Sequence, residues 1–476
     1  MFMVKLKEVS IHKKYICKWA FFATYILELI GGGTPFMAKT GMYVGLDIGT
    51  TSVKVVVAEF IEGQMNIIGV GNAKSDGLNR GIIVDIDKTV NAIQRAVRQA
   101  EEKAGIQIKS VNVGLPANLL EVENCQGMIA VSSESKEITD EDVRNVASAA
   151  LVRSTPPERQ IVAILPQEFT VDGFEGIKDP RGMIGVRLEM FGVVFTGPKT
   201  IIHNTRKCVE KAGLIVNELV IMPLALTETV LSDGEKDFGT IVIDMGGGQT
   251  TTSVMHDKQL KFTHVNQEGG EFVTKDVSIV LNTSFNNAEA LKINYGDAYP
   301  ERTSVSEEFP VDVIGKSEPV KVDERYLSEV IEARVEQIFK KSKEVLDEID
   351  ALELPGGVIL TGGGASLPGV VDLAQEIFDA SVKLYVPNHM GLRNPVFTNV
   401  ISIVEYSAQL NDIYHIAKGA IPGEKIKSAQ PIAVQQEVQY DTYADTTQDD
   451  YDDSEIHESG EKVTGKIKDF FSNIFD

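Results

Sequence analysis

The sequence predicts a duplicated two-lobe α/β fold, and three observations lead to this prediction. First, an apolar strand, a Gly turn and a second strand occur twice, at residues 43–58 and 239–255. Second, further strands and helices follow each hairpin, as in an α/β layer with a mixed sheet. Third, a chain of 476 residues exceeds what one hydrophobic core normally supports. A domain duplication is the economical explanation.

Three glycine-bearing stretches predict a nucleotide clamp. They lie at residues 45–51, 242–248 and 359–364. In the first two, an apolar run ends in an Asp, and a Gly turn and Thr residues follow. Glycine lets backbone N–H groups approach a phosphate closely, and successive N–H groups in such turns bind anions. An Asp at the strand end can hold Mg²⁺ through its waters.

The first lobe is expected to begin with a meander. A third strand near residues 67–71 follows the hairpin, and residues 87–104 form a helix that Gly105 ends. Strand 111–114 completes the layer. Residues 121–203 read differently, with strand-like runs around one helix that begins near Thr139, and predict a small αβ insertion. Helix 200–212, strand 215–221, helix 224–231 and a polar linker at 233–237 follow.

The second lobe repeats this order. Helices are expected after residue 270, at 288–292, at 326–346 and at 370–378, and a strand ends at Leu360 beside the third Gly cluster. The predicted division is 42–120, 204–234 and 394–424 for the first lobe, 121–203 for the insertion, 235–276 and 344–393 for the second lobe, and 277–343 for its smaller subdomain.

Composition restricts the class of function. The chain is 43% hydrophobic and 24% charged, which is typical of a soluble globular protein. Its formal net charge of −23 argues against nucleic acid as the main partner, because neutralising phosphates requires a basic surface. Cys17, Cys125 and Cys208 are widely spaced and odd in number, which disfavours a disulfide framework and predicts a cytoplasmic compartment.

Residues 1–41 form a predicted N-terminal extension. Its apolar run, 15–30, is interrupted by Lys18 and Glu28 and is shorter than the roughly 20 residues that span a bilayer. A signal peptide is one interpretation, although no small-residue cleavage site follows. The other is a gene-start artefact, in which the Gly codons before Met37 are a translated ribosome-binding site. An intact mass that begins at Met1 would contradict the second interpretation.

Residues 425–460 form a predicted disordered acidic linker. No Lys or Arg occurs from residue 428 to 460, and apolar residues are sparse, so the segment cannot offset its ordering entropy. A flexible coil of about 33 residues has a root-mean-square reach of roughly 30 Å.

Residues 461–476 are predicted to form an amphipathic helix. Its apolar side chains cover a stripe of roughly 140°, with lysines on or beside the polar remainder, as in helices that lie in an anionic membrane surface. The alternative is a terminal helix that docks on the body, which does not need the preceding linker. A single short helix of this kind binds a membrane weakly, whereas several linked copies bind it tightly. The tail therefore favours a protein that polymerises. The membrane-facing set is Val463, Ile467, Phe470, Phe471, Ile474 and Phe475 with Lys466 and Lys468.

The two hairpins and the later Gly cluster resemble the actin, Hsp70 and sugar-kinase superfamily. The resemblance implies the actin-like ATPase fold, in which two lobes each have a ribonuclease H-like core. Within it, the chain from about Met42 to Asp476 closely resembles the FtsA family of bacterial cell-division proteins. The most specific matches are segments 165–169 and 182–189 of the insertion and the tethered tail.

The resemblance implies roles for individual residues. Asp47 and Asp244 would hold Mg²⁺ from opposite sides. Lys54 would reach the phosphates, and Glu289 and Lys292 the nucleoside, although both lysines could instead be solvated. The residues that would contact ATP are Gly49, Thr50, Thr51, Lys54, Gly246, Gly247, Gly248, Gln249, Glu289, Lys292, Gly362, Gly363 and Gly364.

One position departs from the superfamily pattern. Related proteins commonly place Gln or Glu before the second hairpin, where it orients the attacking water. The corresponding residue here is Met222, just before Pro223. Because phosphoryl transfer to water relies on such positioning, we expect tight ATP binding with slow or negligible hydrolysis. Brisk turnover by the purified protein would contradict this.

The resemblance also implies a function. The protein would polymerise, anchor FtsZ filaments to the cytoplasmic face of the membrane at the septum, and join other division proteins. Subdomain 277–343 would receive the FtsZ tail, and the inserted subdomain would serve self-association. Basic residues in the subdomain could meet an acidic peptide or belong to a mixed-charge solvated helix; they are Lys321, Arg325, Arg334, Lys340 and Lys341.

Three other classes remain as alternatives. An actin-like pilus-assembly adaptor is the nearest, but it would ordinarily lack the tether and tail. A sugar or acetate-type kinase shares the clamp and needs a catalytic Asp in a substrate cleft. A chaperone would carry a β-sandwich-sized region after the clamp, and none follows here.

Overall fold

The computed structural model describes residues 40–152 and 155–423. The predicted acidic linker and amphipathic tail lie outside these residues, as does nearly all of the N-terminal extension. Among the helices of the described residues, none is both long and apolar enough to cross a membrane.

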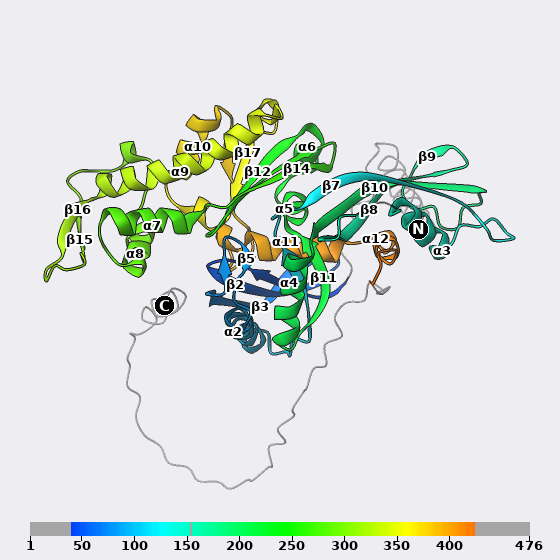
Figure 1. Ribbon diagram of the computed structural model, residues 1–476, viewed down its shortest axis with the longest axis horizontal. Helices are drawn as coiled ribbons and strands as arrows, with labels where there is room; N and C mark the ends of the chain where they lie inside the picture. Colours follow the sequence, from blue (N-terminus) through cyan, green and yellow to red (C-terminus); the bar gives the residue numbers. More distant parts are fainter. Residues whose placement is uncertain (1–39, 153–154, 424–476) are drawn as a thin grey trace, which may run out of the picture.

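The first lobe is built on a five-stranded mixed sheet in the order β11-β6-β1-β2-β3. β1, β2 and β3 form the predicted antiparallel meander, and β6 and β11 add in parallel. α2 and α4 pack on one face and α11 on the other (Figure 1). The strands are β1 (Gly41–Ile48), β2 (Ser52–Ile61), β3 (Gln64–Lys74), β6 (Ser110–Leu115) and β11 (Ile215–Ile221). The helices are α2 (Ile86–Ala104), α4 (Lys199–Lys211), α5 (Met222–Val230) and α11 (Thr398–Gln409).

Local sequence explains why these elements form. In β2, residues 53–58 are all buried because helices cover both faces of the sheet, so the strand reads as a nearly continuous apolar run. Asp85 caps the start of α2 through the backbone N–H of Lys88, and Gly105 ends the helix in the left-handed conformation at φ 66°.

The second lobe repeats the topology of the first. Its sheet runs β18-β17-β12-β13-β14, with the β12–β13–β14 meander antiparallel and β17 and β18 parallel, which confirms the predicted duplication. The strands are β12 (Thr240–Met245), β13 (Thr250–His256), β14 (Gln259–Asn266), β17 (Val358–Thr361) and β18 (Val382–Leu384). The helices are α6 (Asp233–Phe238), α7 (Gly270–Val280), α8 (Phe285–Tyr295), α9 (Glu324–Asp347) and α10 (Val370–Phe378). Four 3-10 turns and a small hairpin complete this half: η1 (Pro300–Arg302), η2 (Ala351–Glu353), η3 (Gly364–Ser366), η4 (Pro395–Phe397), β15 (Glu308–Val311) and β16 (Val320–Asp323).

One expectation for this lobe is wrong. Residues 233–237, predicted as a polar linker, belong to helix α6. The Ser232 hydroxyl accepts from the backbone N–H of Glu235, and the Glu235 carboxylate accepts from the backbone N–H of Ser232. This capping box satisfies backbone donors at the helix start and offsets the low helix propensity of Gly234.

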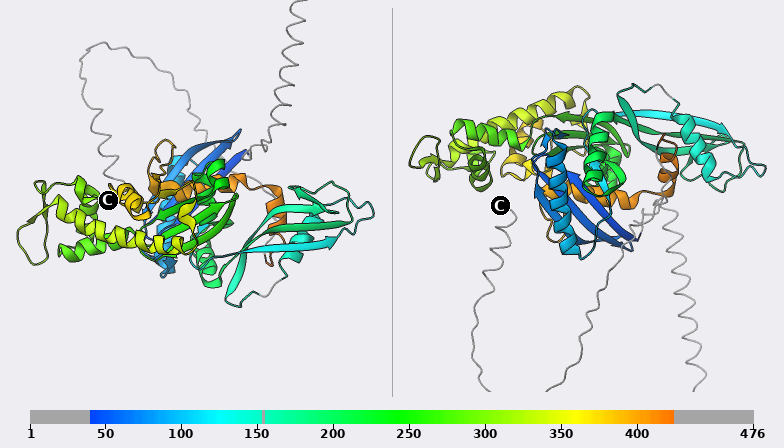
Figure 2. Two further views of the ribbon diagram at one scale, coloured as in Figure 1. Left: turned by 90° about the horizontal axis from the view of Figure 1, so that it is seen from above. Right: turned by 60° about the horizontal axis from the view of Figure 1, so that its bottom comes forward.

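The insertion is a four-stranded antiparallel sheet in the order β7-β10-β8-β9 with helix α3 on one face. It lies at the opposite end of the molecule from α8 and the β15–β16 hairpin (Figures 1 and 2). Its core also contains Ile413, Ala417 and Ile421, from α12 and the turn after it, a region that the sequence division assigns to the first lobe. The elements are β7 (Glu121–Ala130), α3 (Asp140–Ala150), β8 (Arg159–Val171), β9 (Phe174–Ile177), β10 (Arg187–Pro198) and α12 (Asp412–Lys418).

Candidate functional site

The two predicted phosphate turns face each other across the junction of the lobes. A Cβ placed on Gly247 would lie 2.4 Å from Thr51 Cγ2, and one on Gly248 would lie 2.5 Å from Thr50 Oγ1. These separations are too short for any side chain, so glycine is required for the turns to approach this closely. The structure therefore brings the two distant stretches together.

The first turn carries a buried ion pair. Asp47 and Lys54 are paired residues in the β1–β2 register, and Lys54 Nζ lies 3.4 Å from Asp47 Oδ2. Their side chains are only 13% and 7% exposed, so Lys54 is not a solvated lysine. The backbone N–H of Gly49 donates to the carbonyl of Ser52 and closes the turn.

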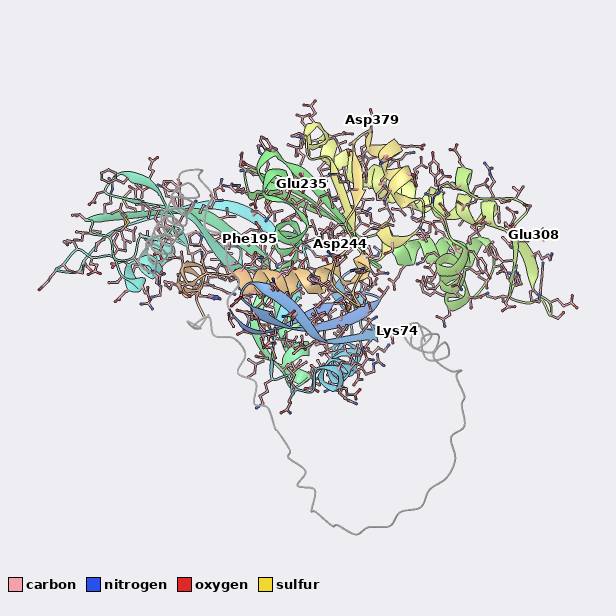
Figure 3. The ribbon with its side chains drawn as sticks, turned by 180° about the vertical axis from the view of Figure 1, so that it is seen from behind. Lys74, Phe195, Glu235, Asp244, Glu308 and Asp379 are labelled. Atoms are coloured by element: carbon pink, nitrogen blue, oxygen red, sulfur yellow. The ribbon has the colours of Figure 1, made fainter. Side chains whose placement is uncertain are left out.

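Asp244 is the next-to-last residue of β12 and lies at the centre of the molecule, where the second-lobe strands meet α11 (Figure 3). Its Oδ2 accepts a 2.9 Å hydrogen bond from Asn399 Nδ2, and its buried Oδ1 has no hydrogen-bond partner. Burial raises the pKa of Asp244 to about 6; the Asn399 hydrogen bond lowers it, and the nearby Asp47 charge raises it. The site thus holds one carboxylate oxygen that lacks a partner.

These features fit a hydrated divalent cation. Two carboxylates act on each other electrostatically from opposite lobes, and a buried carboxylate oxygen is free to accept from a metal-bound water. Within the described residues, no group of three or more His, Cys, Asp or Glu side chains could hold a metal ion. Mg²⁺ needs no such cage, since it usually keeps several waters and binds through one or two carboxylates and substrate phosphates.

The second turn is supported by the start of α7. The carbonyls of Gly246 and Gly247 accept from the backbone N–H groups of Gly270 and Glu271. The side chain of Gln249 is packed against Gly81 of the first lobe, and its Oε1 is buried without a hydrogen-bond partner. Gln249, like Asp244, therefore holds an unused acceptor at the meeting point of the turns.

Glu289 and Lys292 form a network on α8. Lys292 Nζ donates to Glu289 Oε2 at 2.7 Å, to Thr274 Oγ1 at 2.8 Å and to the carbonyl of Gly270 at 3.2 Å. Thr274 Oγ1 also donates to Glu289 Oε2. Because Gly270 contacts the second turn, this network lies beside it, and Lys292 is held by protein partners instead of water.

The third Gly cluster lies against the same turn. Gly362 has φ 91°, and a Cβ there would lie 2.3 Å from Asp244 Oδ1. Gly364 packs on Met245, and Gly363 faces Val396 of η4. All three stretches thus converge on Asp244.

Sequence reasoning missed a hairpin that reaches both turns. β4 (Leu78–Asn79) and β5 (Ile82–Ile83) are joined by Arg80 and Gly81, both at positive φ, as in a two-residue type I′ turn. The Gly81 N–H donates to Thr50 Oγ1, and the Arg80 guanidinium lies 5.2 Å from the ring centroid of Phe272 in α7. Gly at the second turn position, between short apolar runs, is the signal that could have found it.

Met222 begins α5 and is half-buried. A Cβ on Gly114 would lie 2.6 Å from its sulfur, and it contacts a small cluster of Val220, Ala225 and Ile403. No carboxylate or carboxamide is therefore supplied from this position.

The five basic residues of subdomain 277–343 that could meet an acidic peptide each have an acidic partner. Arg334 pairs with Asp276 and Glu268, and Lys341 also pairs with Glu268. Lys321, Arg325 and Lys340 pair with Glu308, Glu329 and Glu336. The mixed-charge interpretation describes this surface better than a free basic patch does.

Comparisons with known proteins agree with this architecture. Residues 241–402 match the family Cell division protein FtsA, residues 118–196 match the SHS2 domain inserted in FTSA, and residues 413–476 match Cell division protein FtsA, C-terminal. Duplicated lobes, facing Asp–Gly turns and an SHS2 insertion define a protein of the actin-like class.

Whole-length relatives give the family. Cell division protein FtsA of Enterococcus faecalis is 89% identical over 440 residues, which cover 92% of this chain and 100% of the relative. That of Enterococcus hirae is 80% identical with the same coverage, and that of Bacillus subtilis is 42% identical over 84% of this chain and 90% of the relative. The chain belongs to the FtsA family of cell-division proteins.

A solved structure supports the fold. The PilM-PilN type IV pilus biogenesis complex aligns with a TM-score of 0.54 over 78% of this chain and 99% of that chain. Its sequence identity to this chain is 15%, so the likeness concerns the fold alone.

Proposed function

We propose that this FtsA-family protein is a membrane-tethered, ATP-binding scaffold that polymerises and anchors FtsZ filaments at the division site. The observation that carries the proposal is the convergence of two Asp–Gly turns, one from each lobe, on one point within a chain of this family. Nucleotide occupancy would set the relative position of the lobes and hence the shape offered to neighbouring copies.

ATP and Mg²⁺ would bind between the turns. Residues 49–51 and 246–249 would contact the phosphates, through N–H groups other than those of Gly49 and Gly246, which close the turns, and Lys54 would neutralise charge beside them. Asp47 and Asp244 would hold the hydrated cation. Glu289 and Lys292 would contact the nucleoside, and residues 362–364 would lie under the adenosine. Met222 offers no group to orient water, which supports slow hydrolysis.

The partners follow from the remaining surfaces. Subdomain 277–343 would receive the FtsZ tail, and the insertion would contact a second copy in the filament. Because the five basic residues named above for this subdomain already have acidic partners, an acidic peptide would compete with Glu268, Glu308, Glu329 and Glu336. Other division proteins would join the assembled filament, and no nucleic acid is expected.

The membrane would be bound by residues 461–476 through the apolar and basic side chains named above. These residues lie outside the described part of the chain, so the support comes from their sequence pattern and the match of residues 413–476 to the FtsA C-terminal family. The protein would then be peripheral on the cytoplasmic face at the septum.

The pilus-adaptor alternative shares the fold and has no further support. The aligned chain of the PilM-PilN complex is 15% identical in sequence to this chain, whereas a relative in the FtsA family is 89% identical. A sugar or acetate-type kinase would gain nothing from the tail.

Liposome co-sedimentation tests the proposal. The full chain and a version ending at Gly460 are mixed with vesicles that contain anionic lipid, with and without Mg·ATP. We expect the full chain to pellet, more completely with Mg·ATP because linked copies bind together, and the truncated chain to stay in solution. Equal pelleting of the two versions would refute membrane binding through the tail.

A further inference from the structure

The first turn of α11 touches the second lobe next to the candidate metal carboxylate. Asn399 Nδ2 donates to Asp244 Oδ2 at 2.9 Å, and Thr398 shares a 2.8 Å hydrogen bond with Thr361 at the end of β17. These two neighbouring residues therefore make two side-chain hydrogen bonds to the second lobe, only one of which reaches the carboxylate.

By its packing, α11 belongs to the first lobe. Val400, Ile401 and Val404 share a buried cluster with Tyr43 of β1 and with β2. A Cβ on Gly45 would lie 2.9 Å from the carbonyl oxygen of Val400, so helix and strand are in close contact. The Asn399–Asp244 bond thus joins a helix fixed to one lobe to the carboxylate of the other.

Two buried oxygens beside this bond have no partner. They are Asp244 Oδ1 and Asn399 Oδ1. An ionised carboxylate only accepts hydrogen bonds, so the Asn399 amide must turn its NH₂ toward Asp244 and its carbonyl oxygen away from it. Buried acceptors without partners are costly, and these two can accept from a bound donor such as a metal-coordinated water.

We propose that Asn399 is a positioning residue for the divalent cation. Its NH₂ group fixes the Asp244 carboxylate, and its Oδ1 accepts from a water in the cation's hydration shell. The inference rests on the proposed Mg·nucleotide site and adds a residue to which no role is assigned above. Because α11 is packed on the first lobe, Asn399 moves with that lobe. Binding of the cation at Asp244 would therefore depend on the position of the first lobe relative to the second.

Metal-dependent nucleotide binding tests the proposal. The dissociation constant of a fluorescent ATP analogue is measured for the full chain at increasing Mg²⁺ and in EDTA. Mg²⁺ should lower the dissociation constant of the analogue. We expect N399A to need about 10- to 100-fold more Mg²⁺ to reach half of this decrease, as is typical when a residue that orients a metal ligand is removed. Binding in EDTA should not change, because Asn399 is not expected to touch the nucleotide.

T398V is the matched control. It removes the neighbouring hydrogen bond between the lobes and leaves Asp244 untouched, so its Mg²⁺ requirement should equal that of the wild type. If T398V shifts the requirement as N399A does, or if N399A weakens binding equally in EDTA, the role is structural and the proposal is wrong. Should N399A fail to fold, N399S serves the same comparison. A wild type that binds no analogue at all refutes the nucleotide site itself, and one that binds without any Mg²⁺ effect refutes only the cation role.

Discussion

Asp244 is a buried carboxylate whose ionised form is unfavourable in the folded protein. Desolvation raises its pKa to about 6, since burial disfavours the charged form, and its Oδ1 has no donor. The ionised carboxylate therefore destabilises the ligand-free fold near neutral pH. The proposed cation would relieve this cost on binding.

This argument predicts a pH dependence for D244N without ligand. The native pKa lies above the unfolded value, so the native state takes up the proton first as pH falls. The wild type is therefore penalised above about pH 6, and the penalty disappears between about pH 6 and 4. We expect D244N to be the more stable form at pH 8 and to lose that advantage by about pH 4. Urea unfolding of both proteins across this range gives the difference, and a constant difference would contradict the assignment.

At the scale of elements, α12 joins the insertion to the first lobe. Its apolar side chains lie in the core of the insertion, while Lys418 Nζ donates to Glu218 Oε1 of β11 and Tyr414 OH donates to the same atom at 3.0 Å. Lys418 and Glu218 are only 7% and 8% exposed. A buried ion pair is costly to break from one side, because a charge is left without a partner.

Replacing Lys418 should therefore destabilise the fold strongly. We expect K418M to lower the free energy of unfolding by about 3–5 kcal/mol, and E218Q/K418M to recover much of this loss, because no buried charge then remains. K340M is the control, since its pair with Glu336 is exposed and should contribute less than about 1 kcal/mol. Denaturant titration measures all three. Similar losses for K418M and K340M would mean that α12 does not depend on the buried pair.

Elements differ in how well the sequence predicts them. The hairpins, α2 and α10 follow from apolar periodicity and Gly positions, which act locally. Helix α6 was missed because Gly234 and its polar neighbours disfavour a helix, while the Ser232–Glu235 capping box was overlooked. The Asn399–Asp244 contact spans 155 positions and leaves no local pattern. The Asp–Gly turns of the site were accessible from sequence, but the residues that join the lobes were not.

At the scale of the whole molecule, the two turns are in contact. Gly247 and Gly248 lie against Thr51 and Thr50. Arg80, which lies over Phe272, and Asn399 also join the lobes near this point. If the proposed triphosphate binds between the turns, they must separate to admit it, so its binding should be linked to the spacing of the lobes.

A reversible crosslink tests that linkage. A Cβ at position 247 would lie 3.3 Å from the Thr51 Cβ, slightly less than the usual disulfide spacing of about 3.5–4.5 Å. T51C also removes one of the two Thr51 atoms that crowd position 247, so T51C/G247C should oxidise after a small shift of the turns. We expect Mg·ATP to slow the crosslink about tenfold at ten times its dissociation constant, because bound nucleotide keeps the turns apart. Thiol counting by mass spectrometry gives the rate.

The single variant T51C is the control, and Cys17 is replaced by Ser in both proteins. Burial raises the pKa of the Cys125 and Cys208 thiols to about 11, so both should react slowly. Equal crosslinking with and without Mg·ATP would place the nucleotide away from the turns.

The placement of α12 has a mechanical consequence. Among the described residues, α12 is the last helix before the C-terminal segment. Tension on the C-terminal segment would be delivered first to α12, and through it to the insertion core and to the edge strand β11. A filament pulled toward a surface would thus load the insertion and the first lobe before the second lobe.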